Sequence, residues 1–286
     1  MKDRTGQVTE KIVFVLQGGG ALGAFQAGAY EALCRAGQEP EWLAGISIGS
    51  INAALIAGNR PGQRLEALRR FWEEVTGAPW LLGSCFEGGP LHEQMRAVCN
   101  ESRATMSTML GAPGFFRPRI PDLFSFLPGL MRQTSWYDTS PLRDTLLALV
   151  DFDYLNAQGP RLSVGAVDVE TGNFTCFDSR ETRITVDHVM ASGALPPGFP
   201  AVEIEGRHYW DGGLVSNSPL QFVLAVPSPR PLCIYQVDLY PSRDILPRTM
   251  AQVEQRMKAR EALEASAVLT ETARATGNAS LRRMAA

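Results

Sequence analysis

Gly45-Ile46-Ser47-Ile48-Gly49 is the stretch of sequence that decides the fold. It follows the Gly-x-Ser-x-Gly pattern, in which a sharp turn between a strand and a helix presents a nucleophilic serine. A Cβ at either glycine would crowd this turn, and the serine itself takes a strained backbone conformation. The same five residues also fit a helix start that Ser47 caps, so the surrounding sequence has to decide between the two interpretations.

The residues on both sides of Ser47 favour the turn. Trp42-Leu43-Ala44 is a short apolar run that indicates a buried strand. Residues 48–57 are apolar with several small side chains, which predicts a buried helix that ends at Gly58. Strand, turn and helix in this order are the context that the motif requires.

The sequence before Ser47 predicts the fold class. Residues 12–16 form an apolar, β-branched run typical of a central parallel strand, and Gly18-Gly19-Gly20 follows at once. Residues 24–36 predict a helix that ends at Gly37, and residues 63–75 predict an amphipathic helix. This alternation predicts an α/β protein with three layers, α/β/α, around a mostly parallel central sheet.

Later segments extend the same domain, which we expect to cover residues 11–245. We expect a helix over residues 142–150, hairpins over 162–177 and 202–210, and a strand over 232–239. Residues 78–137 are rich in proline and aromatic side chains, and they suit either a lid over the sheet or an insertion with a small core of its own. We expect residues 246–286 to be a helical tail that frays at its end.

Composition excludes several functional classes. A length of 286 residues with 45% hydrophobic side chains supports a sizeable core. A net charge of −3 gives no reason to expect nucleic-acid binding. Five scattered cysteines without a CxxC pair predict neither a disulfide framework nor a zinc site, so we expect no metal and no cofactor. A polar N-terminus and the lack of an apolar run of roughly 18 residues predict a cytoplasmic protein, with membrane contact limited to the surface.

A nucleophilic serine needs a base, and the chain offers few histidines for that role. His92 lies in the proline-rich segment, His188 at an expected helix start and His208 in an expected strand, so structural roles suit all three. Asp211-Gly212-Gly213 follows a short strand and could present an aspartate in a tight turn. An aspartate has an ordinary pKa of about 4, so it needs an apolar site to act as a base. A plain β-turn is the alternative.

The three glycines after the first strand are candidates for an oxyanion site. Consecutive backbone N–H groups of Gly18, Gly19 and Gly20 can converge on one anion beside a helix start. Gly18, Gly20 and Gly23 also fit a dinucleotide-binding pattern, but no acidic residue stands at the end of a second strand as that pattern requires.

Taken in order, these motifs resemble the patatin-like phospholipases over residues 11–240. The matching stretches are Gln17-Gly18-Gly19-Gly20-Ala21-Leu22-Gly23, Gly45-Ile46-Ser47-Ile48-Gly49, Ala191-Ser192-Gly193-Ala194-Leu195-Pro196, Asp211-Gly212-Gly213 and Asn217-Ser218-Pro219. The resemblance implies a patatin-like fold, a catalytic pair of Ser47 and Asp211, and an oxyanion site on Gly18, Gly19 and Gly20. It also implies that Gly45, Gly49, Gly212, Gly213 and Pro196 support the site.

One position departs from the family pattern. The family usually has a basic residue before the last glycine of its glycine-rich loop, where this chain has Leu22, as in a bacterial subgroup with Gly-Ala-Leu-Gly. We therefore expect a serine hydrolase of phospholipid or lysophospholipid esters, of the phospholipase A or lysophospholipase type, with headgroup preference left open. An acyltransferase, a hydrolase of short hydroxy-acid esters and a non-catalytic lipid-binding module are the alternatives. The expected partner is a lipid or acyl ester, and the sequence does not indicate the oligomeric state.

Overall fold

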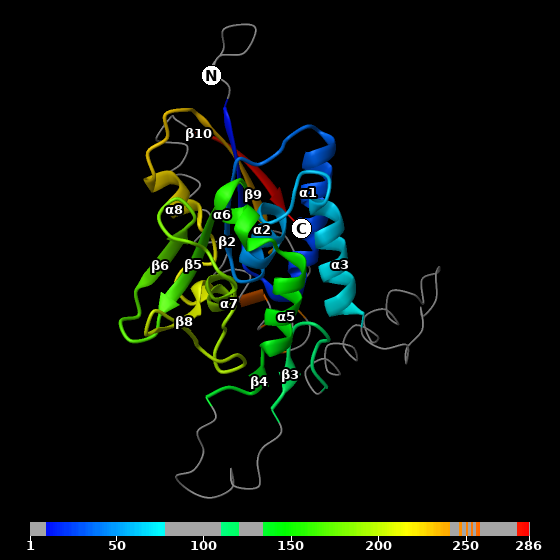
Figure 1. Cartoon of the computed structure of the whole chain (residues 1–286), viewed down its shortest axis with the longest axis vertical. Coiled ribbons are helices and arrows are strands. Elements are labelled where there is room, and N and C mark those ends of the chain that lie inside the picture. The colour runs from blue at the N-terminus through cyan, green and yellow to red at the C-terminus, as the bar shows by residue number, and fades with distance from the viewer. Residues whose placement is uncertain are drawn as a thin grey trace, which may run out of the picture.

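A computed structural model describes residues 10–77, 110–119, 134–240 and 279–285, together with 246, 247, 250, 253, 256 and 257. Its centre is a mixed sheet whose strands are mostly parallel (Figure 1). The parallel part contains, in spatial order, β10 (Ala279–Ala285), β9 (Leu232–Asp238), β1 (Lys11–Leu16), β2 (Trp42–Ile46) and β5 (Arg161–Asp168). Three further strands join it by antiparallel pairing, namely β6 (Phe174–Asp178) and β8 (Arg207–Asp211) on β5, and β7 (Val202–Ile204) on β8. The predicted fold class is confirmed.

Strand β5 brings two distant strands together end to end. Along one edge of β5, residues 163–167 pair with β6. A strand has only two edges, so β2 and β8 share the other one, with β2 opposite residues 161–165 and β8 opposite residues 166–168. Ile46 at the end of β2 lies opposite Gly165, and Asp211 at the end of β8 lies opposite Ala166. The carboxyl ends of β2 and β8 therefore meet.

Alternating side chains of the central strands build a core on each face of the sheet. Phe14 and Leu16 of β1 belong to the larger core, which contains residues of α1 (Ala24–Arg35), α2 (Ile48–Ala57), α3 (Arg64–Thr76), α5 (Ser140–Leu149) and α7 (Val186–Ser192). Val13 and Val15 face the other core, which contains Leu220 and Val223 of α8 (Leu220–Ala225). All ten residues of α2 are buried, as its apolar sequence predicts. The helices on both faces give the three predicted layers.

The chain end differs from the prediction. Residues 279–285 were expected to be the frayed end of a helical tail, but they form β10, which pairs with β9 in parallel register. Arg283 donates a hydrogen bond to the buried carboxylate of Asp238, 2.7 Å away. A polar edge strand has little periodic apolar signal, so the sequence pattern missed it. Most of residues 246–278 of the expected helical tail lie outside the described residues.

Most of the segment over residues 78–137 also lies outside the described residues. Its described parts contribute a two-stranded antiparallel ribbon of β3 (Arg117–Pro118) and β4 (Tyr137–Asp138). The short helix α6 (Phe152–Ala157), which precedes β5, was not predicted either. Within the described ranges, no helix is both long and apolar enough to cross a bilayer.

Candidate active site

Ser47 occupies a strained turn between β2 and α2. Its backbone angles are φ 54° and ψ −126°, a region that non-glycine residues rarely adopt. A Cβ on Gly45 would lie 2.4 Å from the carbonyl oxygen of Gly49, and one on Gly49 would lie 2.2 Å from that of Leu16. Both motif glycines are therefore needed because backbone passes directly against them.

Asp211, the last residue of β8, lies beside the turn that carries Ser47. The residue is only 3% exposed, and its Oδ1 accepts a hydrogen bond from the backbone N–H of Gly213 at 2.7 Å. Its own backbone N–H donates to the carbonyl of Ala194 at 3.0 Å. A Cβ on Gly212 would lie 2.5 Å from the carbonyl oxygen of Gly165, so the Asp-Gly-Gly turn lies directly against β5.

The Ser47 hydroxyl lies close enough to the Asp211 carboxylate to affect its pKa. Burial raises the pKa of Asp211 from 3.8 to about 6, although the Ser47 hydroxyl and the Gly213 N–H, which both favour the ionised form, act in the opposite direction. The pKa of the Tyr240 phenol is raised, mainly by burial and to a smaller extent by the negative charge of Asp211. The site thus holds a hydroxyl against a carboxylate that can take up a proton near neutral pH.

The glycine loop lies against the serine but does not offer all three predicted donors. The backbone N–H of Gly18 donates to the carbonyl of Asn217 at 3.2 Å, and Asn217 Nδ2 donates to the Gly18 carbonyl at 3.0 Å. A Cβ on Gly18 would lie 3.2 Å from the Cβ of Ser47. Gly18 therefore positions the loop. In the described part of the chain the N–H groups of Gly19 and Gly20 have no acceptor, and their role as oxyanion donors stays a prediction.

The segment over residues 192–198, which we call the strap, holds both Ser47 and Asp211. Ser192 is fully buried, and its Oγ accepts a hydrogen bond from the Ser47 N–H at 3.0 Å while it donates to the Gly165 carbonyl at 2.6 Å. Ala194 supplies the carbonyl that binds the N–H of Asp211. The predicted supporting residue Pro196 lies in the same strap. Sequence reasoning placed this block near the site but did not identify Ser192 as the contact.

Removal of the Ser192 hydroxyl should weaken the turn that carries Ser47. In Ser192→Ala the N–H of Ser47 and the Gly165 carbonyl lose a buried partner, so we expect a loss of about 1–3 kcal/mol in the free energy of unfolding and slower covalent labelling of Ser47. Denaturant unfolding and the labelling rate measure the two effects. Ser163→Ala is the matched control, because Ser163 is equally buried but bonds Trp42 and Asp178. Equal labelling rates in both variants would contradict the role of Ser192.

Neither described histidine contacts the pair. The Nδ1 of His188 accepts a hydrogen bond from the Thr185 N–H at 3.1 Å, its ring packs on Phe177 with centroids 4.5 Å apart, and burial lowers its pKa. His208 is exposed on β8, and His92 lies outside the described residues. The described residues also contain no cluster of three or more His, Cys, Asp or Glu side chains that could hold a metal ion.

Comparisons with known proteins give one family and a few distant structures. The model of the family described as "Patatin-like phospholipase" matches residues 14–224. VipD from Legionella pneumophila is similar at 16% identity and a TM-score of 0.43, over 89% of this chain and 55% of VipD. ExoU of Pseudomonas aeruginosa, solved in complex with SpcU, is similar at 15% identity and a TM-score of 0.40, over 93% of this chain and 53% of that one. This chain therefore spans about half the length of these proteins. No curated protein matches it.

Proposed function

Because the chain belongs to the patatin-like phospholipase family, we propose that it hydrolyses lipid esters with Ser47 as nucleophile and Asp211 as general base. The observation that carries this proposal is that the strained Ser47 turn and the buried Asp211 carboxylate meet where the carboxyl ends of β2 and β8 come together on β5. No described histidine takes part in that contact, so the carboxylate acts on the serine directly.

In the proposed first half-reaction, Ser47 Oγ attacks the ester carbonyl carbon as its proton passes to Asp211. The N–H groups of Gly19 and Gly20 stabilise the negative charge that develops on the carbonyl oxygen. The tetrahedral intermediate then expels the alcohol, which takes the proton from Asp211, and an acyl group remains on Ser47.

In the second half-reaction, Asp211 accepts a proton from water as the water oxygen attacks the acyl carbonyl. Collapse of the second intermediate returns that proton to Ser47 Oγ and releases the fatty acid. A base whose pKa is about 6 suits this cycle, because it is ionised at neutral pH and still basic enough to take up a proton.

We propose phospholipids or lysophospholipids as substrates, as in a phospholipase A or lysophospholipase. Family membership supports a lipid ester, and the uncharged Leu22, which is exposed beside the glycine loop, gives this loop no cation for a phosphate headgroup.

A fluorophosphonate probe tests the proposal directly. The probe reacts with activated serines, and we expect one adduct, on Ser47, when labelled peptides are mapped by mass spectrometry. A panel of phospholipid, lysophospholipid, monoacylglycerol and short hydroxy-acid esters then identifies the substrate. An adduct on another serine, or no adduct in folded protein, would exclude the proposed site.

A further inference from the structure

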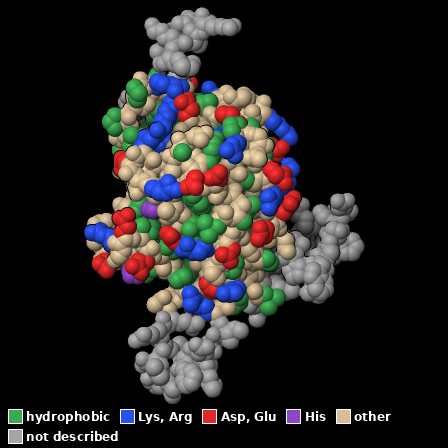
Figure 2. Space-filling view, viewed as in Figure 1, with side chains coloured by type: hydrophobic (Ala, Val, Ile, Leu, Met, Phe, Trp, Pro, Cys, Tyr) green, Lys and Arg blue, Asp and Glu red, His purple; other side chains and the backbone are tan. Residues whose placement is uncertain are grey.

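The β3–β4 ribbon carries exposed apolar and cationic side chains. Figure 1 shows it at the lower end of the molecule, beyond α5 and α7. Trp136, which directly precedes β4, is 65% exposed, and Leu195 of the strap is 48% exposed. Arg117 and Arg119 are also exposed. Figure 2 shows basic side chains at this end of the described chain, with acidic and hydrophobic side chains among them.

Hydrogen bonds connect this ribbon to the candidate active site through the strap. The backbone N–H groups of Trp136 and Tyr137 donate to the carbonyls of Pro197 at 3.0 Å and Gly198 at 2.9 Å. The other end of the same strap holds Ser47 through Ser192, and its middle holds Asp211 through Ala194. The exposed ribbon and the reactive pair are thus fixed to one short segment, so whatever binds the ribbon lies near the site.

Aromatic packing fixes the inner side of the ribbon. The rings of Phe116 and Tyr137 lie 4.7 Å apart, and the ring of Phe116 lies 5.4 Å from Phe199, which follows the strap. Successive side chains of an extended chain face opposite sides. Because Tyr137 packs inward, the side chain of its neighbour Trp136 faces solvent. Trp136 is therefore exposed on a well-packed support.

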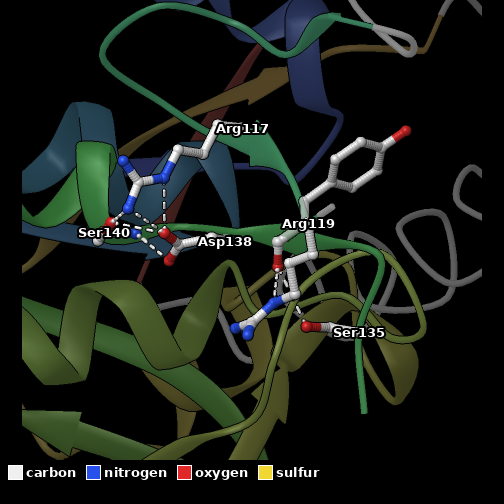
Figure 3. Close-up of polar contacts among 6 residues, drawn as sticks. Arg117, Arg119, Ser135, Asp138 and Ser140 are labelled. Atoms are coloured by element: carbon white, nitrogen blue, oxygen red, sulfur yellow. Dashed lines mark hydrogen bonds and ion pairs between the residues drawn. The ribbon is translucent and has the colours of Figure 1, made fainter. Parts of the chain in front are cut away.

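The ribbon has an excess of positive charge. Arg117 pairs with Asp138 at 2.8 Å, and its guanidinium also bonds Ser140. Arg119 donates through Nε to the Tyr137 carbonyl at 3.1 Å, and no carboxylate of the described residues pairs with it. Figure 3 shows Arg117 turned toward Asp138, with Arg119 beside Ser135. This local positive charge stands against a net charge of −3 for the chain.

We propose that Arg117, Arg119, Trp136 and Leu195 form a docking face for an anionic phospholipid bilayer. Tryptophan favours the membrane interface, leucine enters the acyl region, and arginine attracts anionic headgroups while its stem stays apolar. The inference deepens the proposed function, because a docked ribbon places Ser47 at the surface that holds its substrate.

Binding is measured separately from catalysis in the Ser47→Ala protein, which leaves the vesicles intact. We expect it to co-sediment with vesicles of phosphatidylcholine and phosphatidylglycerol far better than with phosphatidylcholine alone. Adding Arg119→Glu or Trp136→Ala should weaken this binding at least about fivefold each. Arg35→Glu on α1 and Leu147→Ala on the last turn of α5 are the matched controls, because both side chains are exposed and neither belongs to the ribbon or the strap; neither should alter binding.

Activity is then compared in the chain that retains Ser47. Arg119→Glu and Trp136→Ala should lower hydrolysis of vesicle lipid, while turnover of a soluble short-chain ester and the melting temperature stay at the parent values. Parent-like vesicle binding in both variants, equal binding to the two vesicle types, or a parallel loss on the soluble ester would each overturn the docking face. If the parent protein hydrolyses no ester while the variants lose vesicle binding, the proposed function fails and the docking face stands.

Discussion

Replacing Ser47 by alanine should lower the rate of ester hydrolysis by about 10⁴- to 10⁶-fold. Alanine removes only Oγ, so no acyl-enzyme forms and the fluorophosphonate probe has no nucleophile. The Cβ and the N–H that donates to Ser192 both remain, so the turn keeps its main support. Steady-state turnover at saturating substrate measures the effect, and circular dichroism with thermal unfolding checks the fold.

Ser50→Ala provides the control for the nucleophile. Ser50 lies on the first turn of α2, and its hydroxyl donates to the Ser47 carbonyl at 2.7 Å, so this variant perturbs the same turn without removing the reacting oxygen. It should retain activity within about tenfold of the parent, the size of one neutral hydrogen bond. If Ser47→Ala also stayed within that range, Ser47 could not be the nucleophile.

Replacing Asp211 by asparagine should cost about 10²- to 10⁴-fold in turnover, the range of a general base. Asparagine keeps the shape of the side chain and can still accept from the Gly213 N–H, but it cannot take up the serine proton. Only the ionised carboxylate serves as a base, so the parent activity should rise with pH through about 6 and then level off. The variant should lose this pH dependence.

His208→Ala distinguishes a serine–aspartate pair from a triad. The exposed His208 lies in the same strand as Asp211, so its replacement perturbs the same element without touching the carboxylate. We expect activity close to that of the parent in a pH-rate profile on a soluble ester. Loss of activity in His208→Ala comparable to that in Asp211→Asn would restore a histidine to the mechanism.

The raised pKa of Asp211 also determines how the stability of the fold changes with pH. The folded protein binds this proton more tightly than the unfolded chain, because the pKa is about 6 in the fold and 3.8 otherwise. The folded state is therefore favoured below pH 4, and stability falls as the pH rises to about 6. Above that pH the buried charge costs up to about 3 kcal/mol. Asp211→Asn should recover part of it in denaturant unfolding at pH 8, and none at low pH.

Local sequence patterns were sufficient for the elements that flank the nucleophile. The β-branched run of β1, the apolar sequence of α2 and the hairpin expected over residues 162–177 each match the observed elements to within about two residues. These signals are strong because they come from continuous burial or from a specific turn. The hairpin of β7 and β8 was predicted for the same reason.

Long-range relations were beyond such patterns. The hydrogen bond from the Gly18 N–H to the Asn217 carbonyl joins residues that are far apart in the chain. In the sequence, Ser192 is one of several small residues at a helix end, and nothing local indicates that its hydroxyl bonds both Ser47 and Gly165. The pairing of Ser47 with Asp211 was implied by the family resemblance, because no local signal reports the register of two strands on a third.

Strand β5 has a consequence for how activity arises during folding. Gly165 pairs with the last residue of β2, and the next residue, Ala166, pairs with the last residue of β8. These consecutive positions therefore fix how far apart Ser47 and Asp211 lie along β5. A slip of one residue in either register would displace one reactive group by about 3.3 Å and turn its side chain to the opposite face. The proposed hydrolysis would therefore report on sheet assembly, because a chain with β2 and β5 paired but β8 undocked would be compact and inactive.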